Sequence, residues 1–279
     1  MNPSLRTLQV ARPGYTVCVH QVRGHGTEDV VLLHGAGVAS ELTWSPMLPS
    51  LSQFRHLICI DLRGMGSSHA LDFVDRPLSL PDVVDDVLAS VDALSVEHFH
   101  LIGYSFGGLI ALMVHQRATG RCQRMALLEP ALLERESLDD LRRLRAQYAE
   151  SVSALLDDQH VECGITRFLD LIAPNRSRHP RVERMTLQRL AARPRGLAYA
   201  LMAVNEAAWH IERLSLIEAA SDTLALVGGK SPDAAHAFHR VLERQFSHWT
   251  YRPIPGVDHA MPYQKPRQIG HQIASFLLD

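Results

Sequence analysis

Short apolar runs bounded by glycine, proline or aspartate alternate along most of the chain with longer segments of helical period. Such runs are typical of buried strands, and the longer segments have the spacing of amphipathic helices. The pattern therefore predicts an α/β fold, in which a mostly parallel sheet carries helices on both faces. The predicted strands are 16–22, 30–33, 56–60, 99–102, 124–128, 223–227 and 249–254.

Three helices are predicted between and after these strands, over 80–94, 231–246 and 266–278. Each places its apolar residues on one face, as a helix packed on a sheet requires. Ser79 and Asp82 are spaced like a capping box at the start of the first helix. Pro266 is suited to the first turn of the last one.

The alternation stops after Pro130 and resumes at Thr223, and the sequence between them has helical period without a convincing strand. Prolines at 174, 180 and 194 separate the helices of this stretch. We therefore predict a helical cap, residues 132–220, inserted into a catalytic core formed by 1–131 and 221–279. One amphipathic stripe of the cap contains Leu138, Leu141, Leu144, Tyr148, Val152 and Leu155.

Composition narrows the class of protein. With 279 residues, 46% of them hydrophobic and 21% charged, the chain has an ordinary globular composition. A net charge of −2 supplies no field for steering nucleic acid or anionic membranes, so neither is expected as a partner. No apolar run is long enough for a signal peptide or a membrane helix, which predicts a cytoplasmic protein. Monomer and homodimer both stay open.

Two residue types are distributed in ways that need an interpretation. The cysteines at 18, 59, 122 and 163 lack C-x-x-C spacing, and we expect no disulfide between them. Arginines gather between Arg135 and Arg213, which we attribute to genomic base composition. His236 and His239 form an H-x-x-H pair without accompanying carboxylates, so no metal site is predicted there.

The segment G-Y-S-F-G-G at 103–108 follows a predicted strand and opens a predicted helix. A strand, tight turn and helix around G-x-S-x-G form a nucleophile elbow, where glycines let the backbone pack closely beneath a strained serine. Ser105 is therefore the candidate nucleophile. Because a free serine hydroxyl is a poor nucleophile, it needs a base within hydrogen-bond reach and an acid that orients the base.

His259 is the candidate base. It lies in G-V-D-H-A-M-P at 256–262, after the last predicted strand and before the final helix, which brings it to the carboxyl edge of the sheet. Acyl transfer also needs donors for the carbonyl oxygen as it becomes negative. The loop H-G-A-G at 34–37 and the turn after Ser105 supply them, and we assign the N–H groups of Ala36 and Phe106 as the oxyanion hole.

These motifs, together with D-L-R-G-M-G-S-S at 61–68, resemble the α/β-hydrolase superfamily, specifically its capped epoxide-hydrolase-like and esterase-like members. The resemblance implies an eight-stranded sheet with one antiparallel strand near the N-terminus, a cap after the sixth strand, and no cofactor. Related dehalogenases and epoxide hydrolases have aspartate at the elbow, and Ser105 excludes that carboxylate nucleophile here.

The acid of the triad has two candidates. The position at which the family usually has its acid, after strand 223–227, is occupied by Ser231. Asp233 lies two residues further on, in the first turn of the next helix. Glu129 ends the strand after the nucleophile strand, where some relatives have their acid and where a buried charge needs a partner. We favour Glu129, keep Asp233 as the alternative, and rank Asp258 last because its side chain points elsewhere.

The resulting hypothesis is a serine hydrolase that cleaves a carboxylic ester, or a similar acyl bond of a small molecule, through an acyl-Ser105 intermediate. The same triad also serves carbon–carbon bond hydrolysis, thioester hydrolysis and acyl transfer, so the reaction stays open at this point. A small-molecule receptor with a ligand beneath the cap is the alternative from another class. The substrate cannot be read from the sequence of the cap.

Overall fold

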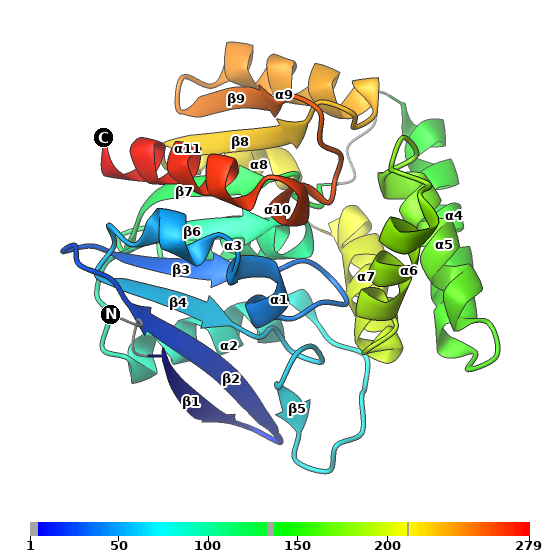
Figure 1. Cartoon of the computed structure of the whole chain (residues 1–279), viewed down its shortest axis with the longest axis horizontal. Coiled ribbons are helices and arrows are strands. Elements are labelled where there is room, and N and C mark those ends of the chain that lie inside the picture. The colour runs from blue at the N-terminus through cyan, green and yellow to red at the C-terminus, as the bar shows by residue number, and fades with distance from the viewer. Residues whose placement is uncertain (1–4, 133–136, 211) are drawn as a thin grey trace.

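The computed structural model describes residues 5–132, 137–210 and 212–279 (Figure 1). Its centre is a sheet with the strand order β1-β2-β4-β3-β6-β7-β8-β9, and the short β5 pairs with β2 beside this path. β2 is antiparallel to its neighbours, whereas all pairs from β4 to β9 are parallel. The strands are β1 (Leu5–Arg12), β2 (Tyr15–Arg23), β3 (Asp29–Leu33), β4 (His56–Ile60), β5 (His69–Ala70), β6 (Phe99–Tyr104), β7 (Cys122–Leu128), β8 (Thr223–Gly228) and β9 (Trp249–Ile254).

Every strand predicted from an apolar run is present, and each end lies within about two residues of the prediction. β1 and β5 were not predicted from the residues. β1 is an edge strand with mostly exposed side chains, so it has no continuous apolar run. β2 is the antiparallel strand that was expected near the N-terminus, and it lies between β1 and β4 in the main path of the sheet. The two-residue β5 pairs with β2 outside this path.

Successive side chains of the buried strands enter two apolar clusters on opposite faces of the sheet. Val31 and Leu33 of β3 pack on the face that carries α2, α3, α8 and α9. Val30 and Leu32 pack on the face that carries α1, the 3₁₀ helix η1, α10 and α11. These helices are α1 (Ser40–Trp44), η1 (Leu48–Leu51), α2 (Leu80–Ala93), α3 (Phe106–Arg117), α8 (Arg213–Glu218), α9 (Asp233–Gln245), α10 (Met261–Gln264) and α11 (Pro266–Leu278).

The predicted helix starts are largely confirmed. The Ser79 hydroxyl caps α2 by accepting the Asp82 N–H at 3.2 Å, and α11 begins at Pro266. α9 begins at Asp233, two residues after the predicted start, because Pro232 has extended backbone angles and acts as the N-cap residue.

A helical insertion connects β7 to β8 and lies beyond the carboxyl ends of the strands, at the right of Figure 1. The predicted stripe of α4 is buried from Leu144 to Leu155, while the side chain of Leu138 is outside the described residues, as is Arg135. No helix in the described part of the chain is long and apolar enough to span a membrane. The domain boundaries at 132 and 220 stay predictions. The insertion contains α4 (Leu138–Leu156), α5 (Val161–Ile172), α6 (Pro180–Leu190) and α7 (Pro194–His210) before α8.

Candidate active site

Ser105 occupies the sharp turn between β6 and α3. Its φ of 52° lies in the left-handed region, which strains a residue with a Cβ. The turn closes only because its flanks are glycines. A Cβ on Gly107 would lie 2.2 Å from the Leu33 carbonyl oxygen, and one on Gly103 would lie 2.6 Å from the Gly107 oxygen. The structure therefore has the strand, turn and helix geometry predicted for a nucleophile elbow.

His34 fixes the loop that follows β3. Its Nδ1–H donates to the Gly35 carbonyl at 2.7 Å, and its Nε2 accepts the Leu62 N–H at 2.9 Å. Complete burial lowers the pKa of His34, so the ring stays neutral and Nε2 remains an acceptor. His34 thus shapes the loop from beneath without reaching the cavity.

The proposed oxyanion donors lie on either side of Ser105. A Cβ on Gly35 would be 3.5 Å from the Ser105 Cβ and 2.9 Å from the Tyr104 ring, so this loop packs directly on the elbow. In the described part of the chain, neither the Ala36 N–H nor the Phe106 N–H donates to a protein acceptor. Two free donors beside a serine are what an oxyanion hole requires, and their role stays a prediction.

Glu129 and His259 are brought together although 130 positions separate them. Glu129 directly follows β7, with a φ of 43° that turns its side chain across the end of β8. His259 lies in the loop after β9, and its Nδ1–H donates to Glu129 Oε2 at 2.6 Å. Because an ionised carboxylate only accepts hydrogen bonds, this contact fixes the proton on Nδ1 and leaves Nε2 free to act as a base.

The second carboxylate oxygen of Glu129 is held as firmly as the first. Oε1 accepts the Gly228 N–H at 2.7 Å and the Ser231 hydroxyl at 2.5 Å. Burial raises the pKa of Glu129, but the hydrogen bonds from His259, Ser231 and Gly228 outweigh burial and hold this pKa below its ordinary value. Ser231, at the usual position of the acid, therefore serves here as a donor to a carboxylate that comes from the neighbouring strand.

The other acidic candidates have different surroundings. Asp233 is the first residue of α9 and forms no hydrogen bond or ion pair with His259 among the described residues. Asp258 accepts the Ala260 N–H and the Gln264 side-chain N–H, each at 2.9 Å, which closes its own loop. The structure thus brings Glu129, rather than Asp233 or Asp258, to the candidate base.

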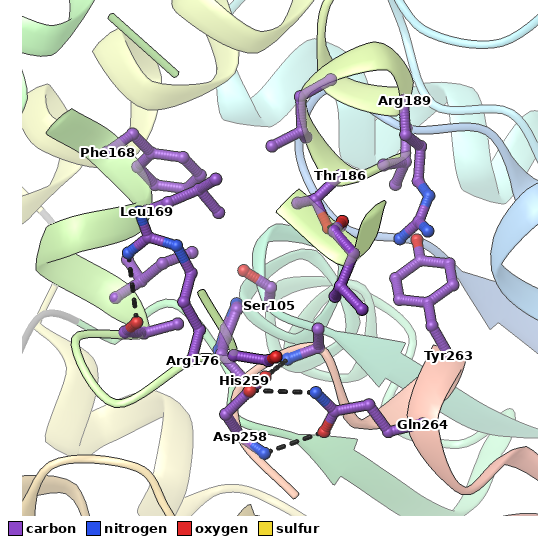
Figure 2. Close-up of a pocket in the computed structure, with 18 of the residues that line it drawn as sticks. Ser105, Phe168, Leu169, Arg176, Thr186, Arg189, Asp258, His259, Tyr263 and Gln264 are labelled. Carbon is purple, nitrogen blue, oxygen red and sulfur yellow. Dashed lines mark hydrogen bonds between the residues drawn. The ribbon is translucent and has the colours of Figure 1, made fainter. Parts of the chain in front are cut away.

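Ser105 and His259 border two cavities that have largely different linings. The first lies between the Ala36 loop and helices α5 and α6 and is partly open to solvent (Figure 2). The second lies between Glu129, α4 and α9. The Ser105 hydroxyl makes no hydrogen bond with His259 in the described structure, as is common before a substrate binds.

Two arginines of the first cavity were missed by the sequence analysis. Arg176 follows α5 and Arg189 lies in α6, both within the arginine-rich stretch that we attributed to base composition. The Arg189 guanidinium lies 3.8 Å from the centroid of the Tyr263 ring. Arg176 lies in a loop, where the sequence has no helical period. The three-dimensional fold is therefore needed to show which arginines of this stretch line the cavity.

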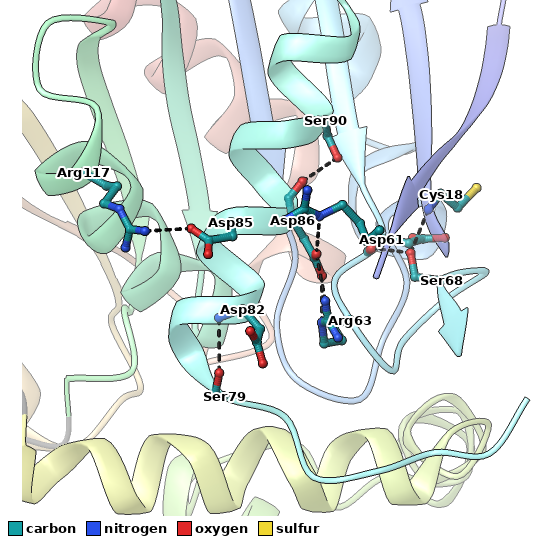
Figure 3. A network of polar contacts seen from close by, with 11 residues as sticks. Cys18, Asp61, Arg63, Ser68, Ser79, Asp82, Asp85, Asp86, Ser90 and Arg117 are labelled. Atoms are coloured by element: carbon teal, nitrogen blue, oxygen red, sulfur yellow. Dashed lines mark hydrogen bonds and ion pairs between the residues drawn. The ribbon is translucent and has the colours of Figure 1, made fainter. Parts of the chain in front are cut away.

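One group of described side chains has metal-ligand spacing. Atoms of Cys18, His20 and Asp61 lie within 4.8 Å of one another, near the network drawn in Figure 3. Both oxygens of Asp61 already accept backbone N–H groups, from Ser40 and Ser67 at 2.8 Å each. Asp61 thereby holds the loop after β4, and these bonds favour a structural role for the group.

His236 and His239 are both used in packing. His236 Nδ1 lies 2.6 Å from the Tyr251 hydroxyl, and His239 accepts the Trp249 ring N–H at 3.3 Å while stacking on that ring. Their rings thus connect α9 to β9.

The His20 ion pair predicts a dependence of stability on pH. Its Nε2 lies 3.5 Å from Asp61 Oδ2, and the Asp61 carboxylate, followed by the Cys18 sulfur, raises the pKa of His20 from 6.5 to about 10. A raised pKa stabilises the fold fully below pH 6.5, and this contribution is lost as the pH rises from 6.5 to about 10. We expect the difference in free energy of unfolding between wild type and His20→Gln, measured in urea, to shrink across that range. A difference that stays constant would contradict the ion pair.

The family of the chain follows from comparison with known proteins. The family model described as alpha/beta hydrolase fold matches residues 28–259. The chain belongs to this family. The solved structure of a thermophilic esterase from Thermogutta terrifontis has the same fold, with a TM-score of 0.76 over 98% of both chains at 21% identity.

Curated relatives match over shorter stretches. A 2-hydroxymuconate semialdehyde hydrolase from Pseudomonas sp. (strain CF600) is 33% identical over 137 residues, which is 46% of each chain. A pimeloyl-[acyl-carrier protein] methyl ester esterase from Edwardsiella ictaluri is 39% identical over 88 residues, 32% of this chain and 31% of the esterase. The chain thus spans less than half the length of the curated relatives that it matches. What the family match shows for this chain is the α/β-hydrolase fold.

Proposed function

We propose that the protein is a serine hydrolase that cleaves a carboxylic ester, or a similar acyl bond, of a small molecule. The observation that carries the proposal is the 2.6 Å contact between His259 Nδ1 and Glu129 Oε2, beside a serine on a strained elbow. This arrangement leaves His259 Nε2 as an acceptor in the cavity that Ser105 borders. Glu129 and His259 would then be the acid and the base of a catalytic triad, with Ser105, which borders the same cavity, as its nucleophile.

In the first half of the reaction, Ser105 Oγ attacks the ester carbonyl while its proton passes to His259 Nε2. The carbonyl oxygen becomes negative and is stabilised by the N–H groups of Ala36 and Phe106. The bond from carbon to the leaving oxygen then breaks, and His259 gives its proton to the departing alcohol. The product of this half is an acyl-Ser105 ester.

In the second half, His259 takes a proton from water, and the resulting hydroxide attacks the acyl carbon. The bond to Ser105 Oγ breaks and Oγ regains the proton from His259. Glu129 stays ionised throughout, because its lowered pKa keeps it a carboxylate. It stabilises the imidazolium each time His259 carries the second proton.

The two cavities suit the two parts of an ester. They meet at Ser105 and His259, so an acyl group on one side and an alcohol on the other would place the scissile bond at the elbow. Helices α5 and α6 cover the first cavity, and α4 covers the second. We infer that the helical insertion acts as a cap that excludes water and determines which substrates fit the site.

A second candidate is hydrolysis of a carbon–carbon bond. It is favoured by the similarity to the 2-hydroxymuconate semialdehyde hydrolase, in which the matched stretch is longer than in the esterase. The same serine, base and donors serve both reactions, so the site geometry does not separate them. The two reactions therefore have to be distinguished by measuring which substrates the protein turns over.

A comparison of substrates tests the proposal. The purified protein should hydrolyse p-nitrophenyl esters, with kcat/KM varying along a series of increasing acyl length because the cavity has a fixed volume. 2-Hydroxymuconate semialdehyde should be turned over more slowly than the best ester. Rapid cleavage of the semialdehyde without ester hydrolysis would move the assignment to carbon–carbon hydrolysis.

A further inference from the structure

Arg176 is a buried cation in the wall of the first cavity. Its side chain is 8% exposed and lies near Phe168 and Leu169 on the α5 side of the cavity (Figure 2). One nitrogen, Nη1, is fully engaged: it is 2.7 Å from Asp170 Oδ1 and donates to the Ala173 carbonyl at 3.3 Å. These contacts hold the guanidinium in place.

The other edge of the Arg176 guanidinium has no hydrogen-bond acceptor among the described residues. Nε and Nη2 are both buried without a hydrogen bond, and Nη2 forms only a long ion pair with Glu183 Oε1, at 3.8 Å. A buried N–H without an acceptor is costly, and more so on a charged group. The fold retains two of them in the wall of the cavity that the candidate nucleophile also borders, which indicates that a ligand supplies the acceptors.

The geometry of this edge selects the ligand. Nε–H and Nη2–H point the same way from a planar group, and their spacing matches the two oxygens of a carboxylate. Phe168, Leu169 and Ile172 give the α5 side of this cavity an apolar surface. Apolar side chains beside one guanidinium suit a ligand with an aliphatic or unsaturated chain that ends in a carboxylate.

The lining of the first cavity contains two arginines, Arg176 and Arg189, and two acids, Glu183 and Asp258. Arg189, on the opposite wall with Tyr263, has no acidic partner in the described part of the chain (Figure 2). Asp258, which also lines the cavity, accepts hydrogen bonds from the N–H groups of its own loop. Asp170 and Glu183 pair with both Arg176 and Arg178, so these two acids balance these two arginines and leave Arg189 as the further cation of the lining.

We propose that the first cavity takes a substrate with a carboxylate remote from the scissile bond, held by Nε and Nη2 of Arg176. This inference rests on the proposed function, since it places the reacting carbonyl at Ser105. A lining side chain changes rotamer as the acid enters, because both nitrogens are covered in the empty cavity. The substrate class is thus an ester, or a similar acyl compound, of a dicarboxylic acid.

The test compares two substrates of the same shape. One is the p-nitrophenyl half-ester of adipic acid, and the other is the p-nitrophenyl ester of adipic acid monoamide, which lacks the charge. We expect wild-type kcat/KM to favour the acid by about 10- to 100-fold, as a charged, paired hydrogen bond provides. Arg176→Met should bring the ratio close to one, and Arg176→Lys, which keeps the charge without the fork, should give an intermediate ratio.

Arg178→Met is the matched control. Arg178 pairs with the same Asp170 and Glu183 but is 53% exposed and lies outside the cavity lining, so its removal should leave the ratio as in wild type. The inference is overturned if wild type shows no preference, if Arg176→Met keeps the preference, or if Arg189→Met alone abolishes it. A ratio taken within one variant is insensitive to the fraction of folded protein.

A binding measurement separates this inference from the proposed function. Glutarate should raise the thermal midpoint of Ser105→Ala, and the shift should disappear when Arg176→Met is added. If neither ester is hydrolysed but glutarate still binds through Arg176, the proposed reaction fails and the acid site stands. If both esters are hydrolysed at equal rates and glutarate gives no shift, the acid site fails and the hydrolase stands.

Discussion

Replacing Ser105 with alanine is expected to lower kcat for a p-nitrophenyl ester by about 10⁶-fold, the loss seen when a triad nucleophile is removed. The reason is that Ser105, on its strained turn, is the proposed nucleophile in the cavity that His259 also lines. KM should change little, because the serine contributes little to binding of the ground state. The residual rate is measured with concentrated enzyme after subtraction of the spontaneous hydrolysis.

Ser177→Ala is the control for this prediction. Ser177 also lines the first cavity, and its hydroxyl accepts the His179 N–H at 3.3 Å, so it has a local structural contact. It should retain a rate within about tenfold of wild type, since its loss removes only one neutral hydrogen bond. Substantial turnover in Ser105→Ala, or a collapse of turnover in Ser177→Ala alone, would contradict the assignment of the nucleophile.

Replacing Glu129 with glutamine is expected to lower kcat by about 10⁴-fold. The amide keeps the shape of the side chain but cannot stabilise the imidazolium of His259, and its N–H group can reverse the direction of the hydrogen bond to Nδ1. The ring would then present the wrong tautomer to Ser105. Ser231→Ala should cost far less, about tenfold, because Glu129 retains the Gly228 N–H as a donor.

Asp233→Asn separates the two acids. Asp233 lies at the start of α9 without a contact to His259, so this variant should keep near-normal kcat and lose only a small helix-dipole contribution to stability. Thermal unfolding of Glu129→Gln shows whether a loss of rate reflects loss of fold. Near-normal turnover in Glu129→Gln together with a large loss in Asp233→Asn would assign the acid to Asp233.

The parts of the fold that were predicted from sequence are those in which burial leaves a pattern. β3, β6 and β8 are buried along their whole length, so their apolar runs are continuous. β1 is exposed on most of its length and left no such run. The helical insertion was predicted from its period, but which of its residues face the elbow depends on how α5 and α6 pack, and periodicity does not encode that.

The candidate site was predictable to the extent that it depends on local backbone geometry. The glycines around Ser105 are required by contacts as close as 2.2 Å, so the elbow appears as a motif in the sequence. The choice between Glu129 and Asp233 was not decided by the sequence. It depends on the positive φ of Glu129 and on donors at the carboxyl end of β8 and just after it, which only the tertiary structure brings together.

The most direct test of the central claim is covalent labelling with a fluorophosphonate, which reacts readily only with a serine activated by a base beside oxyanion donors. Intact mass should show one adduct on the native protein, peptide mapping should place it on Ser105, and Ser105→Ala should remain unlabelled. Glu129→Gln should label far more slowly. A native protein that stays unlabelled, or an adduct that persists in Ser105→Ala, would contradict the account.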